Sequence, residues 1–225
     1  MADRLGEYAA GIGSLAEPVR RRLYEYVASR AEPVGREEVA RAIELPAHTV
    51  KFHLDRLVDE GLLEVEFRRL SGKTGPGAGR PSKLYKRSQR EFAVSLPERR
   101  YDLVGHILAS AFEHVASGAE LDVALHEAAA REGRSLAATG SAEDQLERLG
   151  EALATQGYEP RVEGEVLVLA NCPFDALAKE HTDLVCGLNR SFVQGAADGL
   201  ACDRVEASLE PEAGRCCVKG RLREG

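Results

Sequence analysis

The stretch from residue 47 to residue 88 constrains the fold most, because a helical pattern stops at a glycine and a strand pattern follows at once. Residues 47–60 repeat apolar side chains at helical spacing, which indicates one buried face. Gly61 then provides a left-handed C-cap. Alternation and turn chemistry predict a strand, a loop rich in Gly, Pro and Ser, and a second strand at residues 62–70, 71–82 and 83–88.

Two further helices are predicted before this stretch. Residues 14–30 have an apolar stripe, with Ser14 and Glu17 at capping-box spacing and Pro18 in the first turn. Residues 35–43 form a second, short helix that ends before Pro46, since the residue before a proline avoids the helical region. Three helices followed by a hairpin predict a winged helix-turn-helix.

Charge is distributed unevenly along the chain. The net charge is −7, yet residues 1–90 hold 17 Lys and Arg against 13 Asp and Glu, and the remainder holds 13 against 24. Residues 67–90 contain eight basic residues and no acidic one. A local basic face on an acidic protein can still bind a polyanion such as DNA.

The segment PAHTVKFHLDRLVDEGLLE, followed by GRPSKLYKRS, resembles the DNA-binding half of the ArsR/DeoR-like bacterial repressors over about residues 14–88. The resemblance implies that the helix at 47–60 lies in the major groove of double-stranded operator DNA and that the hairpin contacts the backbone or minor groove. An outward Phe52 suits the methyl group of thymine, whereas His53 is expected to pack. The expected base readers are His48, Thr49, Lys51, Phe52 and Arg56, and the expected phosphate contacts are Lys73, Arg80 and Lys83.

A helical region follows, with helices predicted at 98–117, 120–137 and 142–156. The first has a broad apolar face, which fits either a homodimer contact or packing against the next two helices. A two-fold dimer would read two half-sites on one face of DNA. Residues 158–225 then read as strand, helix and hairpin. We therefore expect an α+β protein with a DNA-binding domain at 1–90, a helical dimerisation region at 91–157 and a small α+β sensor domain at 158–225.

All five cysteines lie in the last quarter of the chain, with 13, 15 and then 13 or 14 residues between them. No apolar run is long enough to span a membrane and no secretory signal is present, so we expect a cytoplasmic protein in a reducing compartment. A disulfide is disfavoured there. Packed free thiols, a zinc site without the usual short knuckles, and an iron–sulfur cluster remain as alternatives.

The frame NCPF…LVCGLN…GRCCV resembles the SufR-like iron–sulfur-sensing repressors. That resemblance implies repression of iron–sulfur cluster assembly genes and a cluster of the [4Fe–4S] type. The implied ligands are Cys172, Cys186, Cys202 and Cys217. Neighbouring residues on a strand point to opposite faces, so Cys216 is expected to be a bystander; it or His181 is the substitute if a ligand drops out.

No nucleophile triad, phosphate-binding loop, zinc-protease motif or C-x-x-C pair occurs in the sequence. We therefore expect a regulator that is not an enzyme. The alternative is a winged-helix regulator that responds to zinc or to a small molecule, with structural cysteines.

Overall fold

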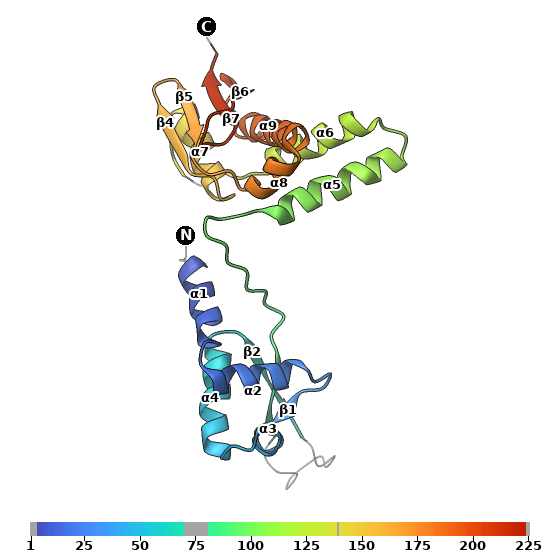
Figure 1. The fold of residues 1–225 in the computed structure, drawn as a ribbon, viewed down its shortest axis with the longest axis vertical. Coiled ribbons are helices and arrows are strands. Elements are labelled where there is room, and N and C mark those ends of the chain that lie inside the picture. The colour runs from blue at the N-terminus through green and yellow to red at the C-terminus, as the bar shows by residue number, and fades with distance from the viewer. Residues whose placement is uncertain (1–3, 70–80, 139, 224–225) are drawn as a thin grey trace. The chain divides into compact units, whose positions relative to one another are not determined.

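The computed structural model describes residues 4–69, 81–138 and 140–223. The chain divides into two compact units, Met1–Val94 and Ser95–Gly225 (Figure 1).

The first unit packs helices against a small antiparallel sheet. Its helices are α1 (Arg4–Ser14), α2 (Pro18–Ala28), α3 (Arg36–Ile43) and α4 (Ala47–Asp59). Its strands are β1 (Val34–Gly35), β2 (Leu63–Arg68) and β3 (Ser82–Arg87), in the order β1-β3-β2. The α4 face expected to be core is confirmed, because Val50, Leu54 and Leu57 are fully buried.

The start of the first unit differs from the prediction. The helix expected at 14–30 begins at Pro18, because the carboxylate of Glu17 accepts hydrogen bonds from the backbone N–H groups of Val19 and Arg20 at 3.0 and 2.7 Å. Ser14 instead ends α1, a helix that the sequence pattern did not predict. Gly61 has φ of 73°, as expected of the cap that ends α4.

The second unit combines five helices with a four-stranded antiparallel sheet. Its helices are α5 (Tyr101–Ala116), α6 (Leu121–Arg134), α7 (Gln145–Ala154), α8 (Asp175–Glu180) and α9 (Thr182–Gly199). Its strands are β4 (Pro160–Glu163), β5 (Val166–Leu169), β6 (Val205–Leu209) and β7 (Val218–Leu222), in the order β4-β5-β7-β6. Helices α5 to α7 share one core with the sheet, so the segments predicted as a helical region and a separate sensor domain form one unit.

Two predictions within this unit need adjustment. The helix expected at 175–199 is interrupted at His181, whose φ and ψ of −132° and 55° are not helical. The apolar face of α5 packs inside the chain, where Val104, Ile107 and Ala111 are buried with α6. Tyr101 and Phe112 of α5 stay 41% and 62% exposed. Intramolecular packing thus accounts for most of the apolar stripe.

Helices α6 and α9 approach closely through glycines. A Cβ on Gly195 would stand 2.1 Å from the carbonyl oxygen of Ala130, and one on Gly133 would stand 2.0 Å from that of Phe192. Only residues without side chains permit such backbone contact. Within the described part of the chain, no helix is long and apolar enough to cross a membrane.

Candidate functional site

Helix α4 presents a mixed polar and aromatic surface to solvent. His48, Lys51 and Arg56 are exposed, Thr49 is half-buried, and the Phe52 ring is 66% exposed. An aromatic ring left this open on a charged helix face is available for contact with a partner. An open hollow beside the helix is lined by Arg20, His48, Lys51, Phe52, Asp55, Arg56 and Asp59.

Asp55 joins this helix to the hairpin. Its carboxylate accepts hydrogen bonds from Lys51 Nζ at 2.8 Å, from Lys83 Nζ at 2.6 Å and from the Tyr85 hydroxyl at 3.0 Å. Burial would raise the pKa of Asp55, but these three hydrogen bonds outweigh it and lower the pKa to about 2. Two lysines predicted to contact DNA are therefore bound to one ionised carboxylate in the free protein.

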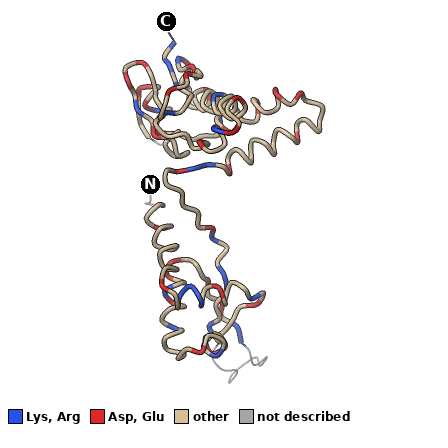
Figure 2. The backbone as a smooth tube through the Cα atoms, in the orientation of Figure 1, with Lys and Arg blue, Asp and Glu red and all other residues tan. Residues whose placement is uncertain are grey.

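The hairpin carries further basic residues along its backbone (Figure 2), and acidic side chains pair with them. Arg68 pairs with Glu66 at 2.8 Å and with Glu32 at 3.3 Å, and Lys86 pairs with Glu64 at 3.5 Å. Lys73 and Arg80, the other expected phosphate contacts, lie outside the described residues.

His53 lies at the edge of the core, as the sequence predicted. Its side chain is 15% exposed, and Nδ1 stands 3.7 Å from the Glu17 carboxylate. The residue therefore contacts the N-terminal cap of α2 instead of facing outward with Phe52.

Three helices, a short turn between α3 and α4, and a hairpin behind α4 define the class of a winged helix-turn-helix DNA-binding domain. Residues 15–66 match the family model described as a helix-turn-helix domain. Comparison with curated proteins and with solved structures gives no match. The matched segment covers α2 to α4 and most of β2, so it supports an ArsR-type winged regulator.

The second unit gathers four of the five cysteines at one end of its sheet. Cys172 follows β5, and Cys216 and Cys217 precede β7. Because β5 and β7 are antiparallel neighbours, the end of one meets the start of the other, and the Cys216 N–H donates to the Leu169 carbonyl at 2.9 Å. Cys186 arrives from the second turn of α9.

We call Cys172, Cys186, Cys216 and Cys217 the thiol cluster. Its thiols form two pairs, one of which is hydrogen-bonded. The Cys186 thiol donates to Cys217 with the sulfurs 3.3 Å apart, and Cys172 pairs with Cys216. Cys172, Cys216 and Cys217 all lie where β5 ends and its antiparallel neighbour β7 begins, so the two pairs are neighbours.

Hydrogen bonding and burial separate the pKa values within the thiol cluster. The neighbouring thiol of Cys216 lowers the pKa of the Cys172 thiol, and Cys172 in turn raises the pKa of Cys216, which burial raises further. Burial raises the pKa of Cys186 to about 12, and its bond with Cys217 acts in the same direction. In the Cys172–Cys216 pair, Cys172 is the thiol that ionises first.

Cys202 lies away from the thiol cluster, contrary to the expected ligand set. It follows the C-terminal end of α9, whereas Cys186 is near the start, which separates them by about 20 Å along the helix. Its thiol instead donates to the carbonyl oxygens of Gln145 and Leu200, at 3.4 and 3.7 Å. The residue is 1% exposed and packs in the core.

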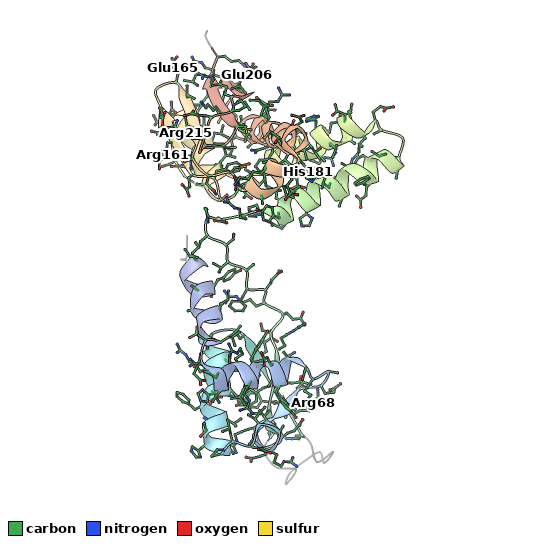
Figure 3. All side chains as sticks on the ribbon, in the orientation of Figure 1. Arg68, Arg161, Glu165, His181, Glu206 and Arg215 are labelled. Atoms are coloured by element: carbon green, nitrogen blue, oxygen red, sulfur yellow. The ribbon has the colours of Figure 1, made fainter. Side chains whose placement is uncertain are left out.

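Strand alternation was expected to turn Cys216 away from the site and Cys217 toward it, but the structure places both residues beside other cysteines. Both precede β7, so strand alternation does not apply, and each contacts a different cysteine. His181, the other expected substitute, is exposed at the junction of α8 and α9 (Figure 3).

A buried polar pair supports the thiol cluster from one side. Asn189 is 1% exposed; its Nδ2 donates to Cys216 Sγ at 3.2 Å, and its Oδ1 accepts from the Tyr158 hydroxyl at 2.5 Å. Sequence reasoning missed Asn189, although a position three residues after Cys186 on a helix lies on the same face.

The donor atoms of the thiol cluster suit a metal, whereas their arrangement in the structure does not. Four thiols are a donor set that zinc and iron–sulfur clusters use. Among the residues that the structure describes, however, no group of three or more His, Cys, Asp or Glu is arranged to hold a metal ion. Metal binding would therefore require the two sulfur pairs to rearrange.

Proposed function

We propose that the protein is a transcriptional repressor in which the thiol cluster controls DNA binding by the winged helix-turn-helix. The helix-turn-helix match at residues 15–66 supports DNA binding and transcription regulation. The convergence of four thiols from three separate segments is the observation that carries the sensing part. The resemblance to iron–sulfur-sensing repressors favours genes of iron–sulfur cluster assembly as targets.

The proposed cofactor is an iron–sulfur cluster of the [4Fe–4S] type. The residues that would hold it are Cys172, Cys186, Cys216 and Cys217, with Cys202 left in the core. Such a cluster would supply a redox-active centre that oxidants and iron limitation can destroy. The protein's own contribution is to bring four soft donors together and to bury two of them, Cys186 and Cys216.

Anaerobic reconstitution with iron and sulfide tests this proposal. The expected product is a brown protein with about four irons per chain and a Mössbauer signature of a cubane cluster. Cys202→Ser is the matched control and is expected to load as fully as the wild type, whereas Cys186→Ser is expected to lose the colour. A colourless protein that retains no iron would refute the cluster.

Zinc is the second candidate, and the sulfur spacing favours it. Two thiolates on a tetrahedral zinc with bonds of about 2.3 Å stand about 3.8 Å apart. The Cys186 and Cys217 sulfurs, at 3.3 Å, would need to move little to reach that spacing. One zinc per chain in protein purified without added metal would select this alternative.

We further propose that the repressor acts as a homodimer on a two-fold operator. A single winged helix makes few contacts, and a dimer reads two half-sites about 34–36 Å apart. The exposed Tyr101 and Phe112 of α5 are available for such a contact. Sedimentation equilibrium should give twice the chain mass of 24.4 kDa, and a monomer at micromolar concentration would contradict the dimer.

A further inference from the structure

We propose that Arg99 is a positioning residue that couples the Cys172 end of the thiol cluster to the chain leading into the second unit. This inference rests on the proposed function, since it takes the thiol cluster to be the sensing site. The segment concerned, residues 95–100, directly follows Val94, the last residue of the DNA-binding unit.

Residues 98–100 of this entry segment form hydrogen bonds, in order, with residues 171–173 of the turn that holds Cys172. The Asn171 side-chain amide donates to the Glu98 carbonyl at 3.1 Å, and its oxygen accepts from Arg99 Nη1 at 2.6 Å. The Arg100 N–H donates to the Pro173 carbonyl at 3.1 Å. The turn that holds Cys172 and the entry segment therefore behave as one hydrogen-bonded piece.

Arg99 makes the contact that involves the cysteine itself. Its Nη1 donates to the Cys172 carbonyl oxygen at 2.8 Å, and its backbone N–H donates to Ser95 Oγ at 2.8 Å. One residue thus connects the backbone of a thiol-cluster cysteine to the first residue of the second unit. Its side chain is only 20% exposed, which protects the bonds from competition with water.

Asn171 fixes the turn in a second direction. It is 7% exposed, and its Nδ2 also donates to the Gly157 carbonyl at 2.6 Å. All the polar atoms of this side chain are therefore engaged, so the turn cannot shift without breaking or carrying its partners. If a change at Cys172 moves the backbone of this turn, Arg99 and residues 95–98 must move with it, because they are hydrogen-bonded to the turn or to Arg99.

The coupling predicts that chemical changes at Cys172 alter the DNA affinity of the first unit. Separation of the Cys172–Cys216 pair on metal binding would displace the 171–173 turn. The direction of the response follows the proposed function, in which the loaded form represses. Couplings between two sites typically change affinity about 5- to 150-fold.

The experiment uses the full-length protein and a duplex that this protein selects from random sequence. Its dissociation constant is measured at fixed salt for metal-free, reduced protein and for protein loaded with iron and sulfide or with zinc. The wild type should show an affinity ratio of about 5–150 between the two states. Arg99→Gln should bring that ratio to within about twofold of one, while metal content and the affinity of the metal-free form stay unchanged.

Two further variants separate coupling from folding. Ser95→Ala removes only an exposed hydroxyl that accepts from the Arg99 N–H, so it should lower the ratio without unfolding the protein. Arg161→Gln, on the exposed surface of β4 (Figure 3), is the matched control and should keep the wild-type ratio. A loaded Arg99→Gln protein with the wild-type ratio overturns the coupling alone. A wild type that takes up neither metal, or that responds to neither, overturns the proposed function and the coupling with it.

Discussion

Asp55→Asn tests how the DNA-binding surface is prepared in the free protein. The substitution keeps the shape of the side chain but removes the charge that binds Lys51 and Lys83 at 2.8 and 2.6 Å. Both lysines become available to the phosphates of a random-sequence duplex, where Lys51 has no specific base to read, and one negative charge leaves the exposed surface of α4. Asp55→Asn should therefore bind random-sequence duplex more tightly and with a steeper dependence on salt.

The size of this effect can be worked out from the two lysines. Each additional phosphate neutralised steepens the logarithmic salt slope by about 0.9, so two lysines add about 1.8. Between 50 and 200 mM salt, the affinity ratio of variant to wild type should then fall about 12-fold. Fluorescence anisotropy with a labelled random duplex measures the slope. Asp59→Asn, which removes a charge from the same exposed face of α4, is the control and should change the slope less.

The same substitution should lower stability. A pKa of about 2 in the folded state, against the ordinary value of 3.8, corresponds to about 2.4 kcal/mol at most, and the 29% exposure of the side chain reduces this to about 1–2 kcal/mol. Because the folded pKa is depressed, the contribution is complete above about pH 4 and is lost as the pH falls toward 2. Unchanged salt slope and unchanged urea midpoint would together refute the role given to Asp55.

Three further results are expected. Cys202→Ser should leave the metal content per chain unchanged by elemental analysis, because Cys202 is outside the thiol cluster. Asn189→Leu should weaken zinc binding about 10- to 100-fold in competition with a chromophoric chelator, because Cys216 loses its buried donor; equal affinity would argue against that role. Gly195→Ala should lower the free energy of unfolding by about 1–3 kcal/mol in urea titrations, because its Cβ would meet the carbonyl oxygen of Ala130.

Local signals explain why the DNA-binding unit could be predicted from sequence. The apolar stripe of α4, the glycine stop and the alternating hairpin each follow from residues close together in the chain. Helix α1 was not predicted because contacts distant in sequence hold it in place. The ring centroids of Tyr8 and Phe92 are 5.5 Å apart, and Gly11 lies against the Phe92 ring. Glu17 displaced Ser14 as the cap for a similar reason, since capping-box spacing alone does not say which of two acceptors is used.

The thiol cluster could be predicted only in part. The resemblance to iron–sulfur-sensing repressors implied a common site for Cys172, Cys186 and Cys217, and these three residues lie together in the structure. Cys202 was expected in the ligand set, because the sequence does not show that the long helix α9 carries the chain to the far end of the sheet. The positions of Cys216 and Cys217 depended on where β7 begins, and element boundaries are the least certain part of a sequence pattern.

The packing of α9 indicates which part of the thiol cluster can move. Cys186 and Asn189 belong to α9, whose backbone packs directly on that of α6 at Gly195 and Gly133. Any shift of α9 would therefore disturb a close-packed contact. A change in sulfur spacing must therefore be taken up by the Cys172 turn and by the segment before β7. The Cys172 turn is the one bonded to the entry segment. A rigid helix on one side and a tethered turn on the other would direct local sulfur chemistry toward the chain that joins the two units.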